Sequence, residues 1–88
     1  MKLIKFKQDN CTPCKMLDGF LNEMGVEVDQ VVNLSNPESD DDLILAGKYA
    51  IEKTPTLILI NDNGSEIQRF KGVGQNGVKS ILARRGLI

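Results

Sequence analysis

The two cysteines of this 88-residue chain lie three positions apart, in the segment Cys11-Thr12-Pro13-Cys14, and the chain contains no histidine. Two thiols at this spacing can close a small disulfide or open to a dithiol. Apolar residues typical of a strand precede them, and apolar residues at helical spacing follow them. A Cys-x-x-Cys pair at such a junction indicates redox chemistry.

The helix start decides which thiol should react. The first backbone N–H groups of a helix have no partner within it, and the peptide dipoles place partial positive charge there. A thiolate at Cys11 is therefore stabilised, and we expect its pKa to lie below the free value of roughly 8.5. Since the thiolate is the nucleophile in disulfide exchange, we assign Cys11 as the attacking thiol and Cys14 as the resolving thiol.

Three neighbours complete the predicted active site. Thr12 and Pro13 separate the cysteines, and Pro13 suits the first helical turn, where its missing N–H costs nothing. Lys15 opposes the helix dipole but would favour a thiolate beside it. An alternative interpretation leaves Lys15 in solvent, partly balanced by Asp18.

Composition indicates a single small domain over residues 1–88. The chain is 41% hydrophobic and 26% charged, as ordinary globular proteins are. Its net charge of −1 gives no reason to expect a nucleic acid or a membrane as partner. The first residues alternate lysine with apolar side chains and lack the apolar centre of a signal peptide. We therefore expect a cytoplasmic protein, in a compartment where structural disulfides are rare.

The hydrophobic periodicity predicts four strands and three helices. Strands are expected at 2–7, 26–32, 56–60 and 66–71, and helices at 12–24, at about 39–50 and from about 78 to Gly86. The first two strands should be parallel because a helix connects them, and the last two should form a hairpin. Helices on both faces would give an α/β sandwich of order βαβαββα, with a four-stranded mixed sheet.

The second helix carries a run of three aspartates at 40–42 in its first turn, where negative charge is favoured. Ser39 is the candidate N-cap before them. The apolar and small residues predicted to share its buried face are Leu43, Ala46, Gly47 and Ala50.

With these elements in order, the chain resembles the thioredoxin superfamily. The resemblance lies in four stretches, 11–17, 47–51, Thr54-Pro55-Thr56 and Gly72-Val73-Gly74. They are similar to the active-site segment, the approach to the cis-proline, the cis-proline loop and the glycine turn after the last strand. The resemblance implies a minimal thioredoxin fold with a cis bond before Pro55. The residues that it implies for substrate binding are Thr54, Pro55, Gly72, Val73 and Gly74.

The same resemblance implies a protein-disulfide reductase that cycles between a dithiol and a redox-active Cys11–Cys14 disulfide, with no bound cofactor and no metal. Its substrates would be proteins that contain disulfides. An NADPH-dependent thioredoxin reductase would restore the dithiol, and the protein would be a monomer.

Several positions depart from the thioredoxin pattern. The chain begins at the family's second strand, as glutaredoxins do. Asn10 stands where thioredoxins place tryptophan. Lys5 stands where they carry a buried aspartate, and Gln30 stands where they place the lysine that pairs with that aspartate. A buried ammonium group is costly, so we expect the tip of Lys5 to reach solvent or a carboxylate.

Other readings of the sequence stay open. A glutathione-dependent glutaredoxin fits the small size, although Pro13 and the Gly72-Val73-Gly74 turn are unusual for it. A metal-bridged module would need two chains, because structural zinc takes four protein ligands and this chain offers two thiols. A non-catalytic member of the superfamily is the remaining alternative.

Overall fold

The computed structural model describes all residues, Met1–Ile88. The elements are β1 (Lys2–Lys7), α1 (Thr12–Met24), β2 (Gln30–Asn33), α2 (Asp40–Lys48), β3 (Thr56–Ile60), β4 (Glu66–Lys71) and α3 (Gln75–Arg85). This sequence of elements confirms the predicted βαβαββα order. None of the three helices combines the length and the apolar character needed to cross a membrane.

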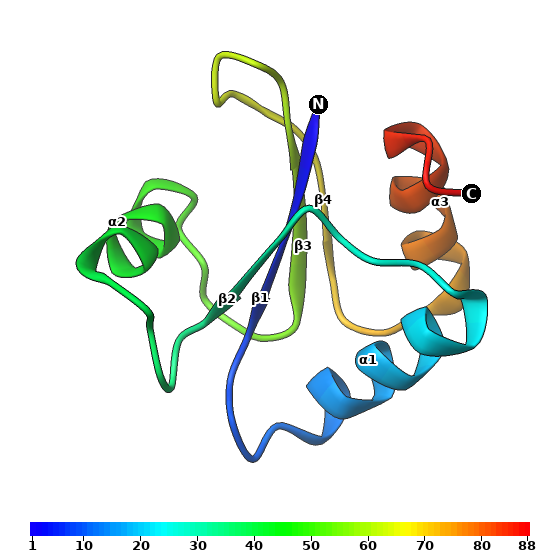
Figure 1. Cartoon of the computed structure of the whole chain (residues 1–88), viewed down its shortest axis with the longest axis horizontal. Coiled ribbons are helices and arrows are strands. Elements are labelled where there is room, and N and C mark those ends of the chain that lie inside the picture. The colour runs from blue at the N-terminus through cyan, green and yellow to red at the C-terminus, as the bar shows by residue number, and fades with distance from the viewer.

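The sheet has the strand order β2-β1-β3-β4. Strand β1 runs parallel to β2 and antiparallel to β3, and β3 pairs with β4 in the predicted antiparallel hairpin. Helix α2 lies on one side of the sheet, while α1 and α3 lie on the other (Figure 1). The predicted mixed sheet with helices on both faces is therefore confirmed.

Two hydrophobic clusters hold these layers together, one on each face of the sheet. Successive side chains of a strand point to opposite faces, so β1 and β3 contribute to both clusters. Every residue of β3 is buried, as the unbroken apolar run predicted. The cluster under α1 and α3 comprises Leu3, Leu17, Leu21, Val26, Leu57, Leu59, Val78, Ile81 and Leu82. The cluster under α2 comprises Ile4, Phe6, Val32, Tyr49, Ile58 and Ile60.

Strand β2 starts later than the valine-rich sequence predicted. Val26 is buried in the core, but regular pairing with β1 begins only at Gln30. Just before it, a carboxylate oxygen of Asp29 accepts the Leu3 N–H at 2.7 Å and also binds Arg85. The Asp29 backbone N–H also donates to the Leu3 carbonyl at 3.1 Å, so Asp29 is joined to β1 through both its side chain and its backbone just before the regular pairing begins.

The predicted buried face of α2 was wrong at three of its four residues. Leu43 is 51% exposed, Gly47 is exposed, and Ala50 lies beyond the helix with a left-handed φ of 51°. Of the predicted residues, Ala46 does pack half-buried against the sheet, together with Leu45, which was not predicted to do so. The helix also ends at Lys48, so Ala50 could not belong to a helical face.

The acidic first turn of α2 contains a buried carboxylate. Asp42 is buried, and one of its oxygens accepts the backbone N–H of Glu38 at 3.0 Å. Ser39 is the N-cap residue by its backbone, but its side chain makes no capping hydrogen bond. One of the three aspartates therefore satisfies a backbone donor before the helix, while Asp40 and Asp41 stay in solvent.

Candidate active site

The cysteine segment forms the first turn of α1. Cys11 is the N-cap residue in an extended conformation, and Asn10 before it has a left-handed φ of 54°, which asparagine tolerates. Pro13 lies in the first helical turn, as predicted. A disulfide joins Cys11 to Cys14, and the backbone N–H of Cys14 points at the Cys11 sulfur, 3.2 Å away. The Cys11 sulfur therefore lies at the positive end of the helix dipole.

The two cysteines differ sharply in exposure. Cys14 is only 2% exposed, whereas Cys11 is partly open to solvent. Of the two cysteines, only Cys11 is therefore accessible from solvent. The remaining predicted support residues, Thr12 and Lys15, are both exposed, and Lys15 forms no ion pair.

A second wall of the site comes from the loop before β3. The Thr54–Pro55 peptide bond is cis. The Thr54 carbonyl oxygen lies 3.8 Å and its hydroxyl oxygen 3.6 Å from the Cys11 sulfur. The backbone N–H of Gly72 donates to the Pro55 carbonyl at 3.0 Å, which brings the Gly72-Val73-Gly74 turn against this loop. The structure thus places Thr54 beside Cys11 and bonds the predicted glycine turn to the neighbouring Pro55 through Gly72.

The backbone of Thr54 has unused hydrogen-bonding capacity. Its N–H donates to no group of the chain, and its carbonyl accepts no N–H. Unpaired backbone groups next to a reactive sulfur can bind an extended segment of another chain in the manner of an added strand.

Gln8 is a site residue that the sequence did not indicate. Its side-chain oxygen accepts the Thr54 hydroxyl at 3.0 Å, across 46 residues of sequence. Gln8 is an exposed polar residue just after β1. Nothing in its type or spacing distinguishes it from any solvated loop residue, so only the folded structure identifies it.

Farther along α1, Asp18 binds two lysines of β1. Its carboxylate hydrogen-bonds the Lys5 ammonium and lies 3.2 Å from the Lys7 ammonium. The Lys5 side chain is only 10% exposed, so the expectation that its tip reaches a carboxylate is confirmed. The alternative pairing of Asp18 with Lys15 does not occur.

The environment of Asp18 has opposing effects on its charge. Burial by itself would raise the pKa of its carboxyl group, but hydrogen bonds and charges from Lys5 and Lys7 outweigh burial and hold the pKa below its usual value. Asp18 therefore stays ionised at neutral pH, and the buried ammonium of Lys5 keeps a partner.

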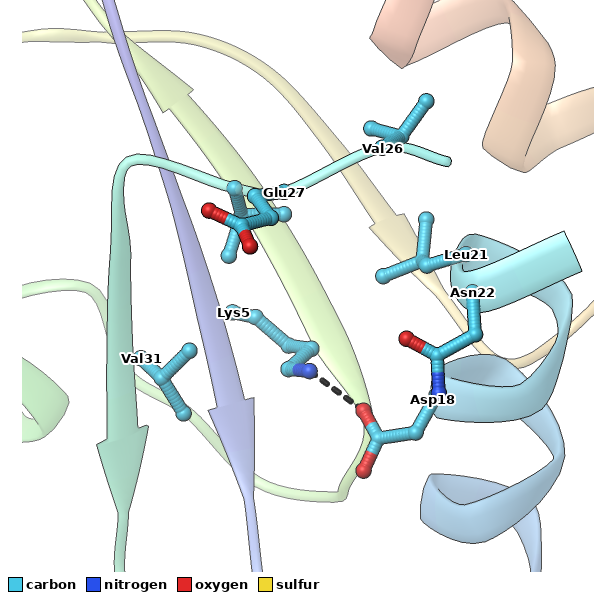
Figure 2. A pocket seen from close by; sticks show the side chains of 8 residues that line it. Lys5, Asp18, Leu21, Asn22, Val26, Glu27 and Val31 are labelled. Carbon is cyan, nitrogen blue, oxygen red and sulfur yellow. Dashed lines mark hydrogen bonds and ion pairs between the residues drawn. The ribbon is translucent and has the colours of Figure 1, made fainter. Parts of the chain in front are cut away.

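This ion pair lies at a pocket of about 390 Å³ between α1 and β2. Figure 2 shows Lys5 and Asp18 pointing toward one another, with Leu21, Val26 and Val31 around them. The register pairs Lys5 with Val31 and places Gln30 opposite Ile4. No cluster of three or more potential metal ligands occurs in the chain.

Comparison with known proteins assigns the family. A family model described as Thioredoxin matches residues 1–84. The chain belongs to the thioredoxin family. It is a thiol–disulfide oxidoreductase, and the Cys11–Cys14 disulfide is its redox-active group.

Individual relatives agree with this assignment. The SPbeta prophage-derived thioredoxin-like protein YosR of Bacillus subtilis is 32% identical over 82 residues, covering 93% of this chain and 95% of the relative. Thioredoxin of Chlamydia caviae is 38% identical over 71 residues, covering 81% and 68%. The solved structure of thioredoxin NaTrxh from Nicotiana alata has a TM-score of 0.67 at 27% identity, covering 94% and 72%. These matches confirm the thioredoxin fold and give no specific support to the glutaredoxin alternative.

Proposed function

We propose that this thioredoxin-family protein reduces disulfides of other proteins, with Cys11 as the attacking thiol. One observation carries the proposal: the disulfide has one reachable sulfur, at the start of α1, and one sulfur buried behind it. Such a pair can form a covalent bond with a large partner through Cys11 only. Cys14 is then left free to complete the reaction from inside.

The proposed cycle balances two electrons over two exchanges. The Cys11 thiolate bonds to one sulfur of the substrate disulfide, the substrate S–S bond breaks, and the departing thiolate takes a proton from solvent. The Cys14 thiol then loses its proton and attacks the Cys11 sulfur. This step breaks the mixed disulfide, forms the Cys11–Cys14 disulfide and releases the second substrate thiolate. The substrate gains two electrons, and the protein ends in the oxidised state of the present structure.

The free backbone of Thr54 supports a docking role for the cis-proline loop. An extended substrate segment would bond to the Thr54 N–H and carbonyl, which holds its sulfur against Cys11. Recognition through backbone groups would accept many sequences. The turn at Gly72-Val73-Gly74, which bonds to Pro55, would form the adjacent edge of this groove.

Return of the protein to its dithiol state requires an electron donor. Membership in the thioredoxin family supports an NADPH-dependent thioredoxin reductase in this role. We further propose that the protein is a monomer and lies in the cytoplasm, where the glutathione pool is reducing. Trapping of free thiols in intact cells should find Cys11 and Cys14 mostly reduced, and a mostly oxidised pair would contradict this location.

The cycle is tested by trapping its intermediate. A Cys14→Ser protein should accumulate mixed disulfides with protein substrates, because Cys11 can form the intermediate but nothing resolves it. The matched control, Cys11→Ser, retains a single thiol that is 2% exposed in the folded chain and should trap almost nothing. Equal trapping by both variants would refute the assigned roles.

The electron donor is tested by coupled reduction of a protein disulfide. NADPH with thioredoxin reductase should sustain turnover at least tenfold faster than NADPH with glutathione and glutathione reductase. The opposite ranking would contradict the proposed partner and favour the glutaredoxin alternative.

A further inference from the structure

The hydroxyl of Thr54 lies between two groups that compete for its single proton. Its oxygen is 3.0 Å from the side-chain oxygen of Gln8 and 3.6 Å from the sulfur of Cys11. In the present disulfide state the proton is donated to Gln8, because an amide oxygen is a much better acceptor than a neutral disulfide sulfur.

Reduction reverses the strengths of these two acceptors. The Cys11 sulfur becomes a thiolate with a full negative charge, and hydrogen bonds to ionised acceptors are about twice as strong as neutral ones. A hydroxyl hydrogen can rotate about its C–O bond without any movement of the backbone. The same Thr54 proton can therefore turn from Gln8 to Cys11 when the disulfide opens.

We propose that Thr54 is a further catalytic residue, whose hydroxyl donates to the Cys11 thiolate in the reduced protein and to Gln8 in the oxidised protein. Gln8 is then a positioning residue that acts only through Thr54. The inference rests on the proposed function in one respect, that Cys11 is the attacking sulfur. It adds a side-chain role for Thr54 to the backbone role in substrate docking.

The two residues should shift the thiolate equilibrium in opposite directions. Loss of the hydroxyl removes a donor to the thiolate, so the thiolate becomes less stable. Loss of the Gln8 oxygen removes the competing acceptor. The Thr54 hydroxyl then donates to the thiolate without breaking a hydrogen bond to Gln8, so the thiolate becomes more stable. Two purely structural residues at these positions would have no reason to act with opposite signs.

The experiment measures the alkylation rate of Cys11 against pH in a Cys14→Ser background, with iodoacetamide as the probe. Thr54→Val should raise the midpoint by about one pH unit, the size expected for one hydrogen bond to a charged group. Thr54→Ser keeps a hydroxyl and should leave the midpoint within about 0.3 unit. Gln8→Met should lower it by about 0.2–0.5 unit. The double variant Gln8→Met/Thr54→Val should match Thr54→Val alone, because Gln8 acts through Thr54.

Some results would overturn the proposal. A midpoint in Thr54→Val within 0.2 unit of the parent would exclude donation to the thiolate, and a raised midpoint in Gln8→Met would exclude competition. Circular dichroism of each variant checks that it is folded. A small alkylating reagent needs no substrate groove, so failure here is separable from failure of the trapping experiment, which tests Cys11 as the attacking thiol.

Discussion

The two parts of α1 hold polar groups in contrasting ways. At its N-terminal end, the Cys11 sulfur accepts the Cys14 N–H at 3.2 Å but lies 3.6–3.8 Å from the oxygens of Thr54, whose backbone N–H has no partner. Two turns farther along, Asp18 binds both Lys5 and Lys7, and Lys5 is nearly buried. The first region leaves hydrogen-bonding groups unpaired, which the proposed docking of a substrate would use, while the second region pairs its charged groups within the chain.

Along this single helix, one region would therefore serve the reaction and the other the stability of the fold. An active site must offer groups that become better bonded during the reaction than before it. A buried ion pair instead stabilises the fold only while both partners remain, because removal of one leaves an uncompensated charge. Changes in the Asp18 region should therefore alter the stability of the protein more than the reactivity of Cys11.

The largest expected effect is the loss of stability on breaking the ion pair of Asp18 with Lys5. Asp18→Ala should lower the free energy of unfolding by about 1–3 kcal/mol, because the buried ammonium of Lys5 loses its partner. For a domain of this size, each kcal/mol corresponds to a loss of about 4–8 °C in melting temperature. Thermal unfolding of the oxidised protein measures the change.

Lys5→Met is the matched control for Asp18→Ala. It removes the buried charge but keeps an unbranched stem of similar length, and Asp18 keeps Lys7 at 3.2 Å. The loss should therefore be clearly smaller. Equal losses in the two variants would mean that the uncompensated Lys5 charge is not the cause. At 0.15 M salt, the Cys11 alkylation midpoint should move less in Asp18→Ala than in Thr54→Val.

The next effect is an acid dependence that follows from the lowered pKa of Asp18. An unfolded aspartate has a pKa of about 3.9, and the folded value lies below it. The contribution of Asp18 to stability is thus fully present above the unfolded value and is lost as the pH falls through the folded value.

Replacement of Asp18 should reduce this acid sensitivity. Between about pH 5 and pH 2.5, the unfolding free energy of Asp18→Asn should fall by less than that of the parent chain. Urea unfolding at several pH values measures both slopes. Parallel pH profiles for the two proteins would show that Asp18 has the same proton affinity in the folded and unfolded states.

The sequence predicted those features whose causes are local. The bounds of α1 follow from its cysteine–proline start and from Gly25 at its end, and the unbroken apolar run of β3 indicated a central strand. The same cysteine segment identified the redox site. These features required no knowledge of which distant residues come together.

Features that depend on tertiary contacts escaped prediction. Just before the late start of β2, the side chain of Asp29 accepts the Leu3 N–H from 26 residues away. Gln8 joins the site only through Thr54, 46 residues along the chain. The partner of Lys5 could be anticipated as a carboxylate because burial of a charge demands one, but the choice of Asp18 depended on how α1 packs on β1.

The smallest predicted effect concerns Gly19, which follows Asp18 on α1. Gly19 is exposed in the interior of the helix, and a Cβ added there would meet no atom within 4 Å. Glycine within a helix is less favourable than alanine because it loses more backbone freedom on folding. Gly19→Ala should therefore raise the free energy of unfolding by about 0.5–1 kcal/mol, as measured by urea unfolding.

Gly25, at the end of the same helix, provides the matched control. A Cβ there would also meet no atom within 4 Å, but Gly25 has a left-handed φ of 67°. Gly25→Ala should therefore lower stability by roughly 1–2 kcal/mol, since only backbone conformation distinguishes the two sites. A loss of stability in Gly19→Ala would contradict this assignment. A shift of the Cys11 alkylation midpoint in Gly19→Ala would instead break the separation between the two regions, because a stronger helix would then change the chemistry at its start.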